Sequence, residues 1–253
     1  TVDPDDDGPG GHSRRTFIGY VMAGTTLVVG ADFAFRPESA EAAIPSIPQI
    51  PELFDLEDLQ TKSALPTSTL ISIEIGTDGI ARFEMPRMEV GQGITTAAAM
   101  IIADELDMPL DQVEVSLAPA RPELVFNQLT GGSNTMNSMY TPIRVAAATA
   151  RGALLGAAST LLGREVADLT VKGGVITDFA GEVLTFGQLS EEAASTDTKQ
   201  MEVTVKKSSD LKLVGTPQNR IDALEAVTGR KQFTTDLDVP DALPTMVCRP
   251  PTV

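Results

Sequence analysis

Two short glycine-rich segments hold most of the groups that could do chemistry. They are Gly91-Gln92-Gly93 and the run Thr130-Gly131-Gly132-Ser133-Asn134-Thr135, and each precedes a stretch expected to be helical. A helix N-terminus offers unpaired N–H groups and the positive end of the helix dipole, so it suits a phosphate or pyrophosphate. Glycine allows close approach of the backbone, while the amide and hydroxyl side chains add neutral hydrogen bonds. These segments predict a site for a polar ligand with many hydrogen-bonding atoms.

Neither segment is a standard nucleotide-binding motif. Thr96 stands where G-x-G-x-x-G requires its third glycine, and no Gly-Lys-Ser or Gly-Lys-Thr occurs in the chain. A tight turn before a helix and a solvated Ser/Asn/Gly loop have the same composition. A purely structural interpretation of both segments therefore stays open.

Composition excludes several other kinds of site. The chain has 253 residues and is 42% hydrophobic, enough to bury a core. Its 35 acidic and 19 basic residues give a net charge of -16, which argues against nucleic acid as a partner. The single cysteine, Cys248, and the single histidine, His12, exclude an internal disulfide and a metal held by clustered thiolates or imidazoles. No catalytic residue and no metal ligand is assigned on this chain.

The elements that would position the two segments follow from hydrophobic periodicity and turn residues. Gly173-Gly174 indicates a hairpin turn, Thr185 with Gln188 a capping box, and Thr141-Pro142 the start of a long helix that ends at Gly163. The expected order is a strand pair at 71–85, a helix at 94–106, a strand at 113–117, the long helix at 141–162, a strand pair at 169–179, a short helix at 185–195 and a strand at 201–205. This order predicts an α+β fold, a mixed sheet with packed helices.

The N-terminal segment is similar to an export signal. Arg14-Arg15 precedes the uncharged run 16–31, and a small-residue stretch follows at 40–43, as in a twin-arginine signal. Residues 1–43 are therefore predicted to be a signal or helical anchor, and the protein to be exported to the periplasm or the extracytoplasmic face of the membrane. The prolines between 44 and 69 indicate a tether. The alternative for the uncharged run is an ordinary buried helix.

Several segments, taken in order, resemble one family. The segments 89–96 and 103–107 resemble a molybdopterin-binding segment of the xanthine oxidase family of molybdenum hydroxylases. With 129–133 and 142–144, the chain is most similar to large subunits of the isoquinoline 1-oxidoreductase type. The segments 210–217 and 228–236 resemble the link to the next domain of those subunits and the entry to their hammerhead domain.

The resemblance implies a division of labour among residues. Gly91, Gln92 and Gly93 would contact molybdopterin. The dinucleotide portion, a cytosine dinucleotide in bacterial relatives, would be held by Thr95, Gly132, Ser133 and Thr135. Residues 70–219 would form a molybdopterin-binding domain portion and 220–253 the start of a hammerhead-like domain. The segment with the family's catalytic glutamate has no match here, so Glu105, Glu123 and Glu202 are expected to be solvated surface acids or acids on a helix face.

The implied function is the cofactor-holding part of an exported enzyme that oxidises an N-heteroaromatic compound or an aldehyde with water as oxygen source. One cysteine cannot hold an iron–sulfur cluster, so a small subunit with [2Fe–2S] clusters would receive the electrons, and a membrane-bound acceptor such as a cytochrome would follow. Cys248 is expected in a buried strand completed by the remainder of the large subunit, present as a second polypeptide. The alternative is a non-catalytic, exported, membrane-tethered binding or scaffold protein.

Overall fold

The computed structural model describes residues 17–31, 71–119, 128, 130–133, 135–196, 198–232, 236–243, 245–246 and 248. Contacts divide the chain into two compact units, Thr1–Gln218 and Asn219–Val253. This division lies one residue from the domain boundary expected between 219 and 220. Each unit is described by itself.

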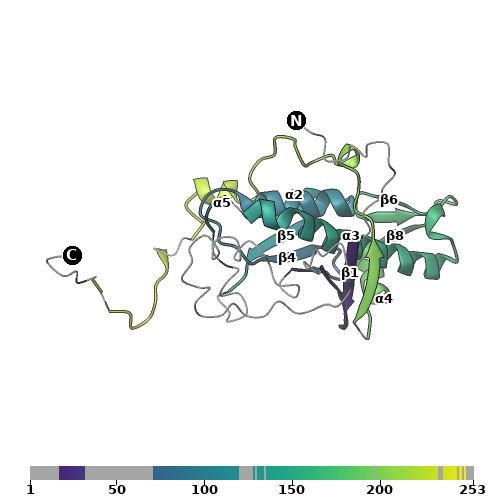
Figure 1. The fold of residues 1–253 in the computed structure, drawn as a ribbon, viewed down its shortest axis with the longest axis horizontal. Coiled ribbons are helices and arrows are strands. Elements are labelled where there is room, and N and C mark those ends of the chain that lie inside the picture. The colour runs from purple at the N-terminus through teal and green to yellow at the C-terminus, as the bar shows by residue number, and fades with distance from the viewer. Residues whose placement is uncertain are drawn as a thin grey trace, which may run out of the picture. The chain divides into compact units, whose positions relative to one another are not determined.

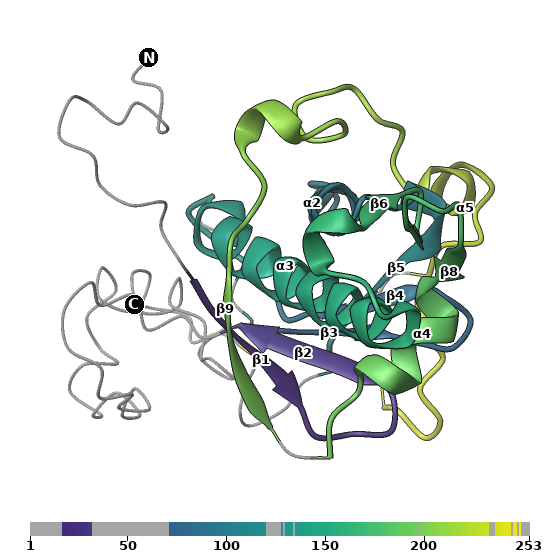
Figure 2. The ribbon, with the colours of Figure 1, turned by 90° about the vertical axis from the view of Figure 1, so that its right-hand side faces the viewer.

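A six-stranded mixed sheet forms the centre of the first unit, in the order β5-β4-β3-β2-β1-β9 (Figures 1 and 2). The strands are β1 (Phe17–Met22), β2 (Leu27–Ala31), β3 (Ser72–Ile75), β4 (Ala81–Met85), β5 (Val113–Leu117) and β9 (Lys199–Val203). Only the pair β4 and β5 is parallel, and the other adjacent pairs of this sheet are antiparallel. The predicted α+β class with a mixed sheet is confirmed.

Hydrophobic and polar side chains alternate along the strands, and this alternation decides which face of the sheet is buried. Ile73 and Ile75 are fully buried, whereas Glu74 between them is exposed. Ile73 pairs with Phe83 of β4, so the buried face continues across the hairpin. Two helices, α2 (Ile94–Leu106) and α3 (Thr135–Leu162), pack against each other and against this sheet (Figure 2). The core therefore lies between one face of the sheet and these two helices.

The long helix α3 begins earlier than predicted. The sequence indicates a start at Thr141-Pro142, but the helix begins at Thr135 and contains Pro142. A proline inside a helix lacks the N–H that would reach the carbonyl four residues before it. Met139 and Ile143 on either side are fully buried, so core packing carries the helix through this position. By length and composition alone α3 could cross a membrane, yet half of its most apolar stretch is buried inside this unit.

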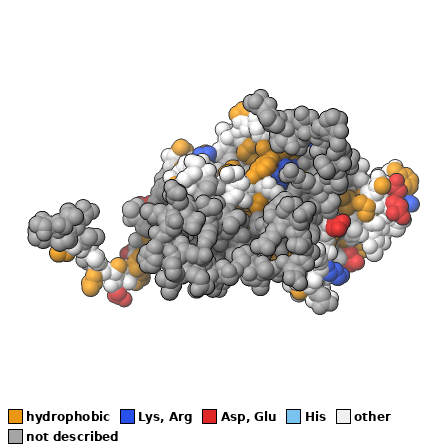
Figure 3. All heavy atoms as spheres, viewed as in Figure 1, with side chains coloured by type: hydrophobic (Ala, Val, Ile, Leu, Met, Phe, Trp, Pro, Cys, Tyr) orange, Lys and Arg blue, Asp and Glu red, His pale blue; other side chains and the backbone are white. Residues whose placement is uncertain are grey.

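A second, three-stranded sheet consists of β6 (Thr170–Lys172), β7 (Val175–Thr177) and β8 (Val183–Thr185), followed by α4 (Phe186–Ala193). Gly173 and Gly174 have φ values of 65° and 77°, as the predicted hairpin turn requires. Thr185 and Gln188 form the predicted capping box. Short 3₁₀ turns occupy Leu110–Gln112, Val166–Asp168 and Ser208–Asp210. Exposed hydrophobic and acidic side chains mix at the outer end of this sheet (Figure 3).

The prediction of a helical anchor in residues 16–31 is wrong. The run forms β1 and β2, which pair with each other and lie between β9 and β3 in the main sheet. Val21, Leu27 and Val29 belong to the hydrophobic core. The predicted domain start at residue 70 must therefore be extended to include 17–31, because without these strands β3 and β9 have no common sheet.

Contact between β1 and α3 is very close at Gly19. A Cβ atom added to Gly19 would lie 1.8 Å from Oγ1 and 2.9 Å from Cβ of Thr149. Thr149 is fully buried, and its hydroxyl donates to the carbonyl of Val145 at 2.7 Å. Only glycine at position 19 allows the helix to approach this strand so closely.

The second unit contains the short helix α5 (Ala223–Val227) and several exposed hydrophobic side chains. Val227, Leu243 and Met246 are 82%, 84% and 93% exposed. The expected buried strand at Cys248 is not present in the described residues of this unit, and Cys248 is exposed. A strand needs a neighbour for its backbone hydrogen bonds, and the described part of this unit offers none.

The contact between Gly19 and Thr149 allows the assignment of residues 17–22 as a strand packed on α3 to be tested by experiment. Gly19→Ala is expected to lower the free energy of unfolding of the full chain by about 1–3 kcal/mol, because the added methyl group overlaps Thr149. Adding Thr149→Ala should restore part of this loss, since it removes the closest atom, Oγ1, together with Cγ2. Urea titration of the single and double variants measures the effect.

Gly24→Ala is the matched control in the same apolar run, because its added Cβ would lie no closer than 3.4 Å to any neighbour. Its effect should stay within about 0.5 kcal/mol. Equal stabilities of the Gly19 and Gly24 variants would contradict the strand assignment.

Candidate functional site

The two glycine-rich segments meet in the folded chain. The Thr130 hydroxyl donates to the carbonyl oxygen of Met88 at 2.9 Å. We call residues 88–93 the glycine loop, and residues 128 and 130–133 the polar loop. Gln128 of the polar loop donates to the carbonyl of Pro119, beyond the end of β5, at 3.2 Å. The two loops thus meet next to the N-terminal ends of α2 and α3.

The backbone of the glycine loop needs its glycines. Gly91 and Gly93 have φ values of 99° and 84°, and Gly93 is the N-cap residue of α2. A Cβ atom on either residue would meet no other atom within 4 Å. Glycine is therefore required here by the left-handed conformation and not by crowding from the protein. The space beside both residues is open.

Gln92 lies between these glycines and is exposed. Its Oε1 accepts from the backbone N–H of Val90 at 2.6 Å, and its Nε2 donates to the carbonyl of Met88 at 3.0 Å. A primary amide has two N–H donors and two acceptor lone pairs on its oxygen. One donor and one lone pair therefore remain for a ligand, held in a fixed orientation by the loop.

Glu89 occupies the backbone donors that the sequence suggests for a phosphate. Its Oε1 accepts from the N–H groups of Gly91 and Gly93 at 2.8 and 2.9 Å. Its Oε2 accepts from both the N–H and the hydroxyl of Thr95, each at 3.3 Å. Sequence reasoning missed this residue. The signal was an acidic side chain just before a helix N-terminus, where a carboxylate commonly binds the first N–H groups.

The other predicted binding residues divide into exposed and buried ones. Gly132 and Ser133 are exposed and have left-handed φ values of 58° and 53°. Thr95 and Thr135 are 7% and 6% exposed. The hydroxyl of Thr95 points to Glu89, so it braces the loop from inside. The accessible groups of the predicted set are therefore Gly91, Gln92, Gly132 and Ser133.

Arg87 precedes the glycine loop and is 1% exposed. Burial lowers the pKa of its guanidinium to about 10, so the group still carries a positive charge at neutral pH. Sequence reasoning missed this residue as well, because an arginine beside a turn is normally solvated.

Two hollows lie away from the loops. One, of about 210 Å³, is lined by the turn Thr77–Gly79 and by Gly173 and Gly174. The other, of about 290 Å³, lies between β1, α3 and the residues around Ser195. Neither hollow is lined by a described residue of the glycine loop or the polar loop. The candidate site is thus an exposed pair of loops and not one of these two cavities.

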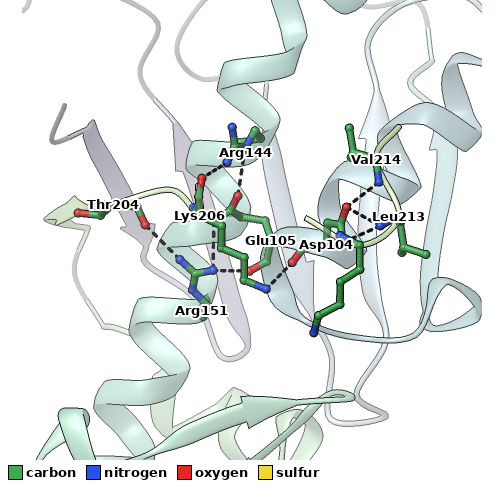
Figure 4. A network of polar contacts seen from close by, with 9 residues as sticks. Asp104, Glu105, Arg144, Arg151, Thr204, Lys206, Leu213 and Val214 are labelled. Atoms are coloured by element: carbon green, nitrogen blue, oxygen red, sulfur yellow. Dashed lines mark hydrogen bonds and ion pairs between the residues drawn. The ribbon is translucent and has the colours of Figure 1, made fainter. Parts of the chain in front are cut away.

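A buried carboxylate fixes α2 against α3. Glu105, near the end of α2, is fully buried and forms ion pairs with Arg144 and Arg151 of α3, each at 3.1 Å (Figure 4). Its Oε1 also accepts from the backbone N–H of Lys206 at 2.7 Å. Arg144 and Arg151 continue to the carbonyls of Lys206 and Thr204. Glu105 lies on a helix, one of the two expected positions, but it is not a solvated surface acid, and two guanidinium groups compensate its burial.

Asp104 binds the segment that follows β9 (Figure 4). Its carboxylate accepts from three consecutive N–H groups, those of Lys212, Leu213 and Val214, at 2.7–3.0 Å. The ammonium group of Lys206 donates to the carbonyl of Asp104 at 2.6 Å, and burial lowers the pKa of that lysine. Glu202 in β9 is exposed, as expected, and Glu123 lies outside the described residues.

These contacts set the relative position of the two loops. The loops at the N-terminal ends meet through Thr130, and the helices meet again through Glu105 and Arg144, so α2 and α3 run in the same direction. Sliding of one helix along the other would break the ion pairs. The network therefore holds the N-terminal ends of both helices, and the loops before them, in one arrangement.

Comparison with known proteins identifies related sequences. Residues 54–222 match the model of the family described as "molybdopterin cofactor-binding domain". The chain is 32% identical over 180 residues to a subunit of nicotinate dehydrogenase from Pseudomonas putida, covering 71% of this chain and 15% of that protein. It is 32% identical over 136 residues to the beta subunit of isoquinoline 1-oxidoreductase from Brevundimonas diminuta, covering 51% of this chain and 17% of that protein.

A third relative is the membrane-bound aldehyde dehydrogenase [pyrroloquinoline-quinone] of Gluconacetobacter polyoxogenes, 28% identical over 208 residues, with 80% of this chain and 25% of that protein covered. The chain thus spans a quarter or less of these relatives. Among solved structures, a Cu,Mo-CO dehydrogenase has a TM-score of 0.41 at 20% identity, over 52% of this chain and 18% of that one. Quinoline 2-oxidoreductase from Pseudomonas putida 86 has a TM-score of 0.40 at 16% identity, over 75% and 23%.

The buried ion pairs predict a large loss of stability on removal of one charge. Glu105→Gln keeps the shape of the side chain but leaves Arg144 and Arg151 without their buried counter-charge. The free energy of unfolding of the full chain should fall by about 3–5 kcal/mol. Glu202→Gln, on the exposed surface of β9, should change it by less than about 0.5 kcal/mol. A loss below about 1 kcal/mol for Glu105→Gln, measured by urea titration, would contradict the structural role of the network.

Proposed function

The chain belongs to the molybdopterin cofactor-binding domain family, and on that premise we propose that it forms part of the cofactor site in the large subunit of a molybdenum hydroxylase. The relatives that are 32% identical are subunits of nicotinate dehydrogenase and isoquinoline 1-oxidoreductase, which supports the xanthine oxidase family among such enzymes. The cofactor would be the cytosine dinucleotide form that the sequence resemblance implies.

The observation that carries this proposal is the junction of the glycine loop and the polar loop through Thr130 and Met88. The polar groups open to a ligand there are neutral, namely the Gln92 amide and the Ser133 hydroxyl, and the space beside Gly91 and Gly93 is open. Neutral donors and acceptors of this kind suit a heterocycle whose edge carries both N–H groups and lone pairs. The residues present therefore fit a molybdopterin cofactor, with Gln92 as a contact of the pterin and Gly132 and Ser133 as contacts of the dinucleotide portion, as the sequence resemblance implies.

The proposed reaction is the hydroxylation of an electron-poor carbon. When bound, the molybdenum cofactor supplies a two-electron oxidation in which R–H and H₂O yield R–OH, two protons and two electrons. The names of the relatives, which refer to nicotinate, isoquinoline and aldehyde, favour an N-heteroaromatic compound or an aldehyde as R–H. This chain would bind and orient the cofactor, and we assign no proton transfer to its residues.

The proposed complex contains further subunits. A small subunit with [2Fe–2S] clusters would accept the electrons, because this chain has one cysteine and a cluster needs four ligands. A membrane-bound acceptor such as a cytochrome would follow it. The remainder of the large subunit would cover the exposed Val227, Leu243 and Met246 of the second unit. The much greater length of the relatives supports such a remainder.

Gln92 provides the direct test of the cofactor site. Gln92→Ala removes the oriented amide, so cofactor affinity should fall about tenfold and molybdenum per complex should fall with it. The residue is exposed on a loop, so the free energy of unfolding should fall by no more than about 1 kcal/mol. Metal analysis and release of cytosine nucleotide from the purified complex measure cofactor content.

Gln200→Ala, exposed in β9, serves as the control and should leave molybdenum content unchanged. Full cofactor content in the Gln92 variant would count against the assignment of this residue. Absence of molybdenum from the wild-type complex, expressed with sufficient molybdate, would favour the scaffold alternative.

Export by the twin-arginine route is a further proposal, supported by Arg14 and Arg15 in the sequence. Replacing both with lysine should retain the complex in the cytoplasm, because the receptor of this route reads the arginine pair itself. Arg230→Lys, elsewhere on the surface, should leave localisation unchanged. Cell fractionation followed by immunodetection gives the answer, and an unaltered distribution of the double variant would rule the route out.

A further inference from the structure

Four donors in the described part of the chain bind the carboxylate of Glu89. They are the N–H groups of Gly91, Gly93 and Thr95 and the hydroxyl of Thr95, at 2.8–3.3 Å. Both carboxylate oxygens take part, so neither is directed only to solvent. Two of these donors, the N–H groups of Gly93 and Thr95, lie in the first turn of α2, where backbone N–H groups would otherwise be available to an anion. Glu89 therefore stands in the place where a phosphate would otherwise bind.

The electrostatic consequence is that a second anion is disfavoured at this position. A bound carboxylate neutralises the positive end of the helix dipole and repels a phosphate brought close to it. Displacing Glu89 would also break its hydrogen bonds to the N–H groups of Gly91 and Gly93, at 2.8 and 2.9 Å, which are strengthened by the charge of the carboxylate. The glycine loop thus offers a ligand its neutral groups only.

The same contacts orient Gln92. Gly91 and Gly93 flank it in the chain, and both are fixed by Glu89 through their N–H groups. Their φ values are 99° and 84°. In a free chain these glycines would adopt many other backbone conformations as well. Holding both N–H groups on one oxygen selects this conformation and presents the Gln92 amide in a single direction.

We propose that Glu89 is the permanent internal anion of the glycine loop and a positioning residue for the cofactor. It excludes phosphate groups from the N-terminus of α2 and holds Gln92 toward the neutral, heterocyclic part of the ligand. The phosphates of the dinucleotide are bound elsewhere. This inference rests on the proposed function for the identity of the ligand. The binding of the N–H groups by Glu89 is independent of that function.

The first experiment is hydrogen–deuterium exchange of the peptide spanning residues 86–97, with the full chain in its isolated complex. Glu89→Ala should increase exchange in this peptide by about tenfold, since three N–H groups lose a charged acceptor. Acetate supplies the missing carboxylate, so it should slow exchange again in the variant but not change the wild type. Inorganic phosphate should likewise leave exchange in the wild type unchanged.

Two results of this experiment would overturn the proposal. Unchanged exchange in Glu89→Ala would mean that the carboxylate does not hold these N–H groups. Slower exchange in the wild type with phosphate, compared with chloride at equal ionic strength, would mean that phosphate displaces Glu89 and that the residue acts as an exchangeable occupant. Glu191→Ala, exposed on α4, is the matched control and should leave the peptide unaffected.

The second experiment measures molybdenum per complex in Glu89→Ala and in Glu89→Gln, which keeps the side-chain shape if the alanine variant fails to fold. Both should hold several-fold less molybdenum than the wild type, and acetate present during assembly should raise the content of the alanine variant. Normal molybdenum in a variant whose peptide exchanges rapidly would overturn the positioning role while leaving the proposed function intact. A wild type without molybdenum would remove the proposed function, yet the exchange experiment would still decide what Glu89 binds.

Discussion

Burial of two adjacent carboxylates, Asp104 and Glu105, is the constraint on which the rest of the first unit depends. They lie side by side in α2 but serve different partners: Glu105 binds the arginines of α3, and Asp104 binds the backbone at Lys212–Val214. A buried charge is tolerated only with close compensating partners, so each of these segments has one permitted position. One turn of α2 thus fixes the position of α3 and of the segment after β9 relative to α2. Weak apolar packing of the alanine-rich faces alone would permit sliding.

The electrostatic character of the candidate site also depends on a carboxylate that is compensated by partners within the chain. The chain is strongly acidic, with a net charge of -16, and the glycine loop contains its own carboxylate at the helix N-terminus. Recognition at this site therefore depends on the direction of hydrogen bonds and on backbone shape. Such a site discriminates between ligands by the pattern of donors and acceptors along one edge of the ligand. A polar ligand atom without a partner in the site gives up its hydrogen bond to water and gains none in return.

The sequence allowed much of the fold to be predicted where periodicity and turn chemistry agree. The hairpin around Gly173-Gly174, the capping box of Thr185 and the helix at 94–106 are confirmed. The run 16–31 was misassigned because uncharged residues suit a helix and a buried strand pair equally, and its turn at Gly24 was not recognised. The loops were located by their glycines, but Glu89 and Glu105 depend on partners brought close only by folding. Burial of Glu105 could not be read from a residue type that is usually exposed.

The position of β1 in the sheet determines how late during translation the sheet can be completed. Its last neighbour in the sheet is β9, and the N–H of Ala23 meets the hydroxyl of Thr198, which lies 175 residues later in the chain. A ribosome adds about 5–20 residues per second, so β1 emerges roughly ten to thirty-five seconds before its second partner strand exists. During translation this apolar segment waits with one edge unpaired, open to chaperones and other binding proteins. The order of synthesis thus makes completion of the sheet a late event, and contacts of such long range also slow folding itself.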